Sequence, residues 1–128
     1  AIHEELEKHN IALAETKLEE LPSSILTESA TKRHVAILWN NLGIIQERSG
    51  GTEVSVKAFK KAVALDPQNP IAHLNLAHAY WGLRDPALTE DFLRKVVALS
   101  PDEPFPHVAL ADLLQEKDHL PEAGKHLA

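Results

Sequence analysis

Eight histidines are the residues of this 128-residue chain best suited to chemistry, because an imidazole can bind a transition metal or transfer a proton near neutral pH. They lie along the whole chain, at His3, His9, His34, His73, His78, His107, His119 and His126. No two of them have the spacing of an HExxH zinc site or of another tight set of helical ligands. We therefore predict no metal site and no cofactor.

Other catalytic patterns are missing as well. The sequence has no Gly-rich phosphate loop and no recognisable setting for a nucleophilic serine, and it contains no cysteine, which excludes disulfides but leaves the compartment open. The adjacent carboxylates Glu4-Glu5 and Glu19-Glu20 are expected on solvated helix faces. We predict that the chain is not an enzyme, although it could be the docking domain of a larger enzyme.

Charge and hydropathy argue against two further classes of protein. The formal charge of −6 argues against a sequence-independent nucleic-acid binder, which needs a positive surface. No stretch approaches the roughly 18 apolar residues of a membrane span, so we predict no membrane insertion. Because the chain begins at Ala1 and contains no Met, we expect it to be processed or to be part of a longer protein.

Equivalent residue types return along the chain with a fixed period. Residues 39, 73 and 107 occupy equivalent places, and 73 minus 39 and 107 minus 73 both give 34. The sets that share this spacing are Trp39, His73 and His107; Leu42, Leu76 and Leu110; and Pro67 and Pro101. A fixed period of this length indicates a stacked repeat protein.

Each period reads as two helices joined by a turn. The first helix is expected from about residues 30–33 to Ser49, and Gly50-Gly51 supplies the left-handed conformation that ends it. Its partner covers 53–65, with Thr52 as N-cap. The next pair is a helix over 70–83 and a helix ending at Leu99, joined by a turn at 84–86. A last helix over 104–117 turns at 118–120 into a helix that begins at Pro121 and is truncated or continues in a longer parent protein.

The segment before the repeats is different. Residues 1–21 lack Gly and Pro and have apolar residues at helical spacing, which predicts an amphipathic helix. We expect this helix to cap the apolar face of the first repeat, the alternative being an unrelated flanking helix. Residues 22–29 are ambiguous: they could form a short helix that carries Ile25 and Leu26 into the core, with Thr27 or Ser29 as N-cap of the following helix.

The repeated residues resemble a known family. The first period has Trp39, Leu42 and Gly43, followed by Ser55, Phe59, Ala62 and Pro67, which resembles the tetratricopeptide repeat (TPR). The first repeat has Gln46 where the family has an aromatic residue. The second keeps that aromatic at Tyr80, but has His73 for the tryptophan and Thr89 and Val96 for small residues. The resemblance covers residues 36–128.

The resemblance implies an all-α fold, an alpha-alpha superhelix (TPR solenoid) of about three helix-turn-helix repeats with an N-terminal extra helix. The implied organisation is one domain, with an N-terminal helical cap or extension at 1–35, repeats at 36–69 and 70–103, and a partial third repeat at 104–128. Gly43, Ala77 and Ala111 lie where the first helix of each repeat must approach the second closely.

The resemblance also implies a concave groove lined by the first helix of each repeat. Its predicted binding residues are Ile37, Asn40, Asn41, Ile44, Ile71, Leu74, Asn75, His78, Trp81, Phe105, Val108 and Asp112. Glu47, Ala109 and Gln115 complete the set. Some TPR proteins hold the C-terminal carboxylate of a chaperone with Lys, Asn and Arg residues in the groove. Only Asn75 corresponds to a member of that set here, so a chaperone tail is rejected as the partner. Asn41 and Asn75 could instead hydrogen-bond the backbone of an extended ligand.

Trp81 is the most informative of these residues. It follows Tyr80 directly, so the two side chains point about 100° apart on a helix. If Tyr80 packs inward, Trp81 faces the groove as a binding anchor; alternatively it packs against the neighbouring repeat. We predict a protein-interaction module or scaffold that binds a peptide or helix. The alternative is self-association, with a homo-oligomer formed through the open end of the third repeat.

Overall fold

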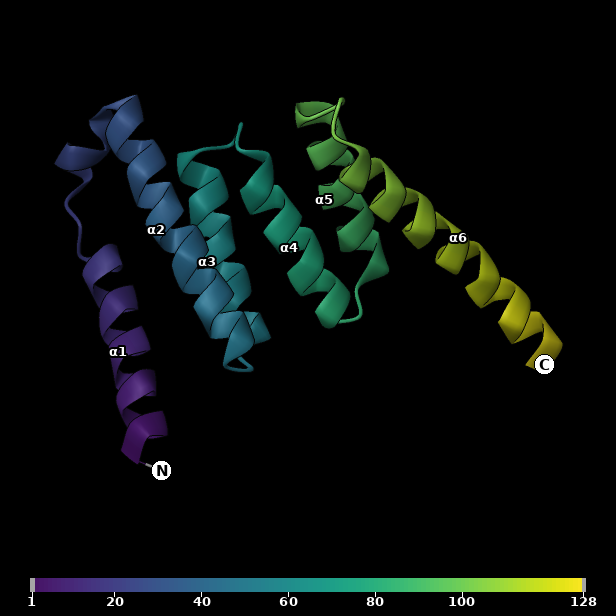
Figure 1. The fold of residues 1–128 in the computed structure, drawn as a ribbon, viewed down its shortest axis with the longest axis horizontal. Coiled ribbons are helices and arrows are strands. Elements are labelled where there is room, and N and C mark those ends of the chain that lie inside the picture. Colours follow the sequence, from purple (N-terminus) through teal and green to yellow (C-terminus); the bar gives the residue numbers. More distant parts are fainter. Residues whose placement is uncertain (1, 128) are drawn as a thin grey trace.

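The computed structural model describes the backbone of residues 2–127 and the side chains of residues 5–116. Helices joined by short turns and loops are the only regular secondary structure of the described backbone (Figure 1). In chain order they are α1 (Ile2–Glu19), the short 3-10 helix η1 (Ser23–Thr27), α2 (Ser29–Arg48), α3 (Thr52–Leu65), α4 (Pro70–Gly82), α5 (Pro86–Leu99) and α6 (Pro104–Leu127). None of the described helices is both long and apolar enough to cross a bilayer.

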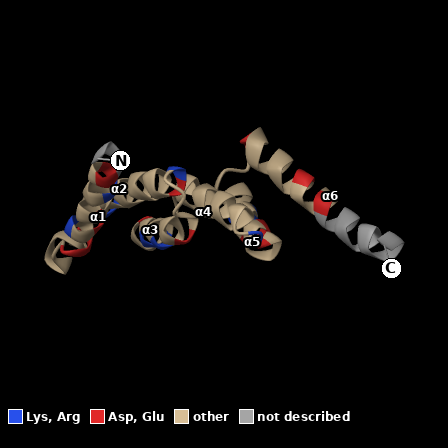
Figure 2. Cartoon of the chain, turned by 90° about the horizontal axis from the view of Figure 1, so that it is seen from below, with Lys and Arg blue, Asp and Glu red and all other residues tan. Residues whose placement is uncertain are grey.

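The helices pack mainly against their neighbours in the sequence. α2 pairs with α3 and α4 pairs with α5, while α3 packs on α4, α5 on α6, and α1 on α2. Seen from below, α3 and α5 lie on one side of the row and α2 and α4 on the other (Figure 2). This arrangement confirms the predicted all-α superhelix of helix-turn-helix repeats.

The two helix-turn-helix junctions have the same geometry. After α2, the N–H of Gly50 donates to Glu47 O at 3.0 Å and that of Gly51 donates to Gln46 O at 2.8 Å. After α4, one period later, Arg84 and Asp85 make the same two bonds to Trp81 O and Tyr80 O. This is the Schellman arrangement, which places one residue in the left-handed region. That residue is Gly50 (φ 88°) in one turn and Arg84 (φ 60°) in the other.

The loops between pairs also repeat. The Nε2–H of His73 donates to the carbonyl of Pro67 at 2.9 Å, and that of His107 donates to the carbonyl of Pro101 at 2.8 Å. Both histidines replace a large residue of the repeat, which predicts that they pack inside; His73 is buried, but His107 is exposed, so the prediction is wrong for His107. Each histidine therefore connects the first turns of its helix, α4 or α6, to the preceding Pro-containing loop by a hydrogen bond.

The core is a row of small clusters along the stack. Trp39 and Leu42 of α2 pack with Ala58 and Ala62 of α3 in the first cluster. The second cluster contains Val56, Phe59, Leu76, Ala79 and Tyr80, and the third contains Ala77, Leu93 and Leu113. Each cluster joins helices that are consecutive or nearly so in the chain, as expected of a stacked repeat protein.

The N-terminal helix lies against the first cluster. Ile11, Leu18 and Leu21 pack against it, and so does Leu26 of η1, in agreement with a capping role. Ile25 is 42% exposed, so the prediction that it enters the core is wrong. Adjacent residues of a 3-10 helix point about 120° apart, so Leu26 faces α2 and Ile25 does not.

Predicted N-caps were wrong at two helices. The N-cap of α2 is Glu28, which makes no side-chain capping bond, rather than Thr27 or Ser29. The N-cap of α3 is Gly51, and Thr52 is already the first helical residue. The reason at α3 is the tight Schellman turn, which leaves no room for another residue between Gly51 and the helix.

The predicted turn at 118–120 is also wrong, because α6 runs without interruption from Pro104 to Leu127. The turn after α4 has Asp85, whose side chain caps α5 by accepting from the N–H of Leu88 at 3.1 Å. Leu120 stands in the corresponding place before Pro121 and has no capping oxygen. Without a returning helix packed on it, Ala111 is exposed, in contrast to the predicted close contact.

Candidate functional site

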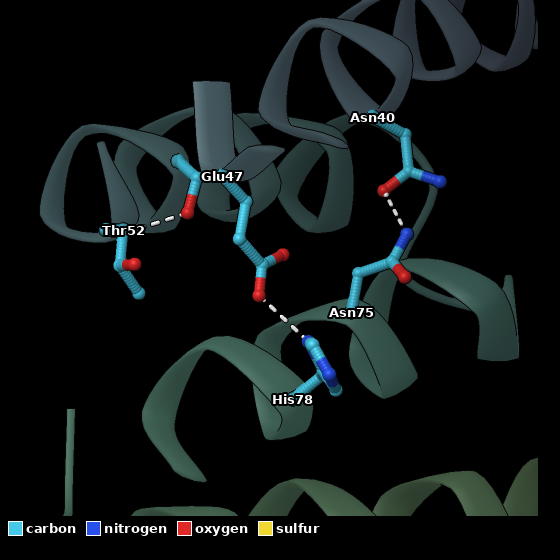
Figure 3. A network of polar contacts seen from close by, with 6 residues as sticks. Asn40, Glu47, Thr52, Asn75 and His78 are labelled. Atoms are coloured by element: carbon cyan, nitrogen blue, oxygen red, sulfur yellow. Dashed lines mark hydrogen bonds and ion pairs between the residues drawn. The ribbon is translucent and has the colours of Figure 1, made fainter. Parts of the chain in front are cut away.

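Two seams between alternate helices carry the candidate site residues: the seam between α2 and α4, and the seam between α4 and α6. The first is bridged by polar side chains (Figure 3). Asn75 Nδ2 on α4 donates to Asn40 Oδ1 on α2 at 2.8 Å, and His78 Nδ1 donates to Glu47 Oε1 at 2.6 Å. These contacts connect α2 directly to α4. Asn40 is buried, and its amide oxygen accepts the hydrogen bond from Asn75 within the protein.

The seam between α4 and α6 holds a cleft of ≈ 260 Å³. Its lining residues come from three helices: Leu74, Ala77, His78 and Trp81 of α4; Thr89 and Leu93 of α5; and Phe105, Ala109, Asp112, Leu113 and Glu116 of α6. Ala77, Leu93 and Leu113 belong to the third core cluster, so they form the buried floor. The cleft is therefore apolar at its base and open above it.

Packing of Tyr80 determines the position of Trp81. The Tyr80 ring stacks on Phe92 of α5, with ring centroids 5.6 Å apart and planes inclined by 15°. Tyr80 is consequently buried, and the next residue on the helix must point in another direction. Trp81 of α4 is 47% exposed and Phe105 of α6 is 63% exposed, and both line the cleft. The expected divergence of Tyr80 and Trp81 is thus present.

Charges around the cleft come from one helix. α4 contains no Asp, Glu, Lys or Arg and is tan throughout in Figure 2. Asp112 and Glu116 of α6 are exposed carboxylates at the cleft, and no Lys or Arg lines it. Within the part of the chain whose side chains are described, no hydrogen bond or ion pair involves either carboxylate. The described residues also contain no group suited to hold a metal ion.

Of the predicted site residues, Asn40 is buried and bonded to Asn75, and the others fall into three groups. Five line the cleft between α4 and α6: Leu74, His78, Trp81, Phe105 and Asp112. Ile44 and Asn75 line a second hollow, which lies between α2 and α4 and also reaches His78. Exposed positions outside these two hollows are Ile37, Asn41, Ile71 and Val108.

Sequence reasoning did not assign Leu113, Thr89 and Glu116 to the site. Leu113 and Thr89 line the cleft because of where α6 packs on α5, and no periodic pattern encodes that placement. Glu116 could have been found, since it lies one helical turn after Asp112 and therefore on the same face of α6.

Comparison with known proteins agrees with this geometry. A family described as "TPR repeat" matches residues 49–83, and one described as "Tetratricopeptide repeat" matches residues 71–103. No curated protein sequence gave a significant match. Among solved structures, PcrH from Pseudomonas aeruginosa is similar at a TM-score of 0.51 and 15% identity, over 85% of this chain and 86% of that chain. At this identity the similarity is one of fold.

Proposed function

Because this chain belongs to the tetratricopeptide repeat family, whose repeats mediate contacts between proteins, we propose that it is an interaction module for a peptide or helix of a partner protein. The proposed site is the side of the stack formed by α2, α4 and α6, and its centre is the cleft between α4 and α6. Stacked repeats commonly bind along such an extended surface.

The exposure of Trp81 and Phe105, which both line one cleft, is the observation that carries this proposal. Large apolar side chains that gather at a hollow mark an interaction site, whereas single scattered ones do not. Tryptophan is also enriched among the residues that dominate binding energies at protein interfaces.

The size of the cleft favours a side chain of a protein over a small-molecule ligand. Its volume of ≈ 260 Å³ is below the roughly 300–1,000 Å³ of small-molecule sites. A peptide or helix would place one apolar residue in the cleft and run on along the exposed residues Ile71 and Val108. Modules of this kind bind at about micromolar affinity, or roughly 8 kcal/mol.

The test is selection of random peptides displayed on phage against the wild-type protein, followed by affinity measurements on the recovered peptides by fluorescence anisotropy. We expect Trp81→Ala to weaken binding by about 2 kcal/mol, or roughly thirtyfold, because it removes the anchor. Val54→Ala is the control, since Val54 is a similarly exposed apolar residue on α3, away from the cleft. Recovery of no specific peptide, or equal affinity for wild type and Trp81→Ala, would contradict the proposal.

A further inference from the structure

We propose that the partner segment carries an apolar anchor residue with a Lys or Arg within one helical turn of it, and that the cleft between α4 and α6 binds both. This inference rests on the proposed function, and it deepens that function by specifying the chemistry of the partner. Two observations support it: the difference between the two seams and the charges of α6.

The two seams can be compared position by position, because adding one period to each residue of the first gives its counterpart in the second. Asn40 and Asn75, which bond across the first seam, become Leu74 and Ala109. Glu47 and His78 become Trp81 and Asp112. The side chains of Leu74 and Ala109 cannot hydrogen-bond to each other. Trp81 and Asp112 both line the open cleft.

The polar bridges that tie α2 to α4 therefore have no counterpart between α4 and α6. In their place, Leu74, Ala109 and Trp81 leave apolar surface along the seam. Apolar surface of this kind gains about 25 cal/mol per Å² when it is removed from water. An apolar side chain inserted from another molecule would thus replace the missing contact between the helices.

Carboxylates of α6 specify what should flank that side chain. Asp112 and Glu116 are neighbours on the helix surface, four residues apart. Facing them from α4 are only neutral residues and His78, whose Nδ1–H is directed to Glu47; from α5 the cleft receives Thr89 and Leu93. No described cation of this chain balances the two charges, so a cation supplied by the partner would be complementary.

A second copy of this chain does not satisfy the same requirement. In a two-fold dimer formed through this cleft the patch meets its own copy, and the patch has no Lys or Arg to pair with the Asp112 and Glu116 carboxylates. The formal charge of −6 adds long-range repulsion between copies. A basic, apolar segment of another protein is therefore the occupant we infer.

The experiment uses the same phage-displayed random peptides, selected separately on the wild type and on the double variant Asp112→Asn/Glu116→Gln. Peptides from the wild-type selection should share an apolar residue with Lys or Arg within one turn of it. Their affinity for the double variant should be about five- to tenfold lower at low ionic strength, as expected from two exposed ion pairs. The difference should shrink at high salt, because exposed charges are screened.

Glu53→Gln/Asp91→Asn is the matched control, since it removes the same charge from exposed positions on α3 and α5. Circular dichroism would verify that both double variants fold. Equal affinities for the two double variants, or selected peptides without basic residues, would overturn this inference while leaving the proposed function in place. Failure to recover any specific peptide would overturn both.

Self-association is a further outcome of the same study. Light scattering over a concentration series compares the wild type with the Trp81→Ala variant. We expect it to show no dimer of the wild type that is lost in the variant. Detection of such a dimer would identify a second copy as the occupant and overturn the inference of a basic partner.

Discussion

Phe59 fills the space in which a side chain at Gly43 would lie: a Cβ atom there would stand 2.5 Å from Cε1 of the ring. The ring is fully buried and cannot move aside without displacing the second core cluster. We expect Gly43→Ala to lower the free energy of unfolding by about 1–3 kcal/mol, the usual cost of overpacking a core. Urea denaturation followed by circular dichroism measures this change.

Gly82→Ala is the matched control for that substitution. A Cβ atom at Gly82 would meet Thr52 at 3.7 Å, an ordinary van der Waals distance. Because alanine favours the helix over glycine by roughly 0.5–1 kcal/mol, this variant should be at least as stable as the wild type. A Gly43→Ala protein as stable as Gly82→Ala would show that the two helices do not pack as described.

Arg84 stands where the equivalent turn has Gly50, and both have positive φ. The left-handed conformation costs a non-glycine residue about 1–2 kcal/mol in the folded state. Glycine in turn stabilises the unfolded state by roughly 0.4–1 kcal/mol, because it gives the unfolded chain more conformational entropy. The net expectation for Arg84→Gly is a gain of about 0.5–1 kcal/mol in stability, seen as a higher urea midpoint. A lower midpoint would mean that the Arg84 side chain makes a stabilising contact.

Asn40 and Asn75 provide a test of the bridge between α2 and α4. Asn75→Ala leaves the buried oxygen of Asn40 without its donor, at a cost of about 1–3 kcal/mol. Asn40→Leu with Asn75→Ala recreates the residues of the second seam, and the double variant should lose less stability than the two single variants together. A coupling energy of about 0.5–1.5 kcal/mol is expected in the double-mutant cycle. Strictly additive losses would argue against the hydrogen bond.

The stack of helices can be predicted well from the sequence, because the same helix–helix contacts recur in each repeat and need the same residue types at the same spacing. Leu42, Leu76 and Phe59 are buried where helices have to meet. His73 and His107 repeat a bond to a proline carbonyl, which explains a polar residue at a position that holds Trp39 in the first repeat. Positions under such recurring constraints can be predicted from spacing alone.

Features that depend on a particular partner helix are less predictable. Ala111 carries the small-residue pattern, yet it is exposed because α6 continues instead of turning back. The cleft depends equally on where α6 packs, so Trp81 and Phe105 could be assigned to a groove, but Thr89 and Leu113 could not. Side-chain types indicate which residues can bind; only the placement of α6 brings them together.

Fluorine NMR of protein labelled with 5-fluorotryptophan tests the central proposal most directly, since the chain has two tryptophans, one buried at Trp39 and one exposed at Trp81. Trp81→Phe assigns the two resonances. On titration with a peptide selected on the wild type, we expect the Trp81 resonance to shift saturably and the Trp39 resonance to stay in place. A peptide that saturates by anisotropy while the Trp81 resonance does not move would contradict docking between α4 and α6.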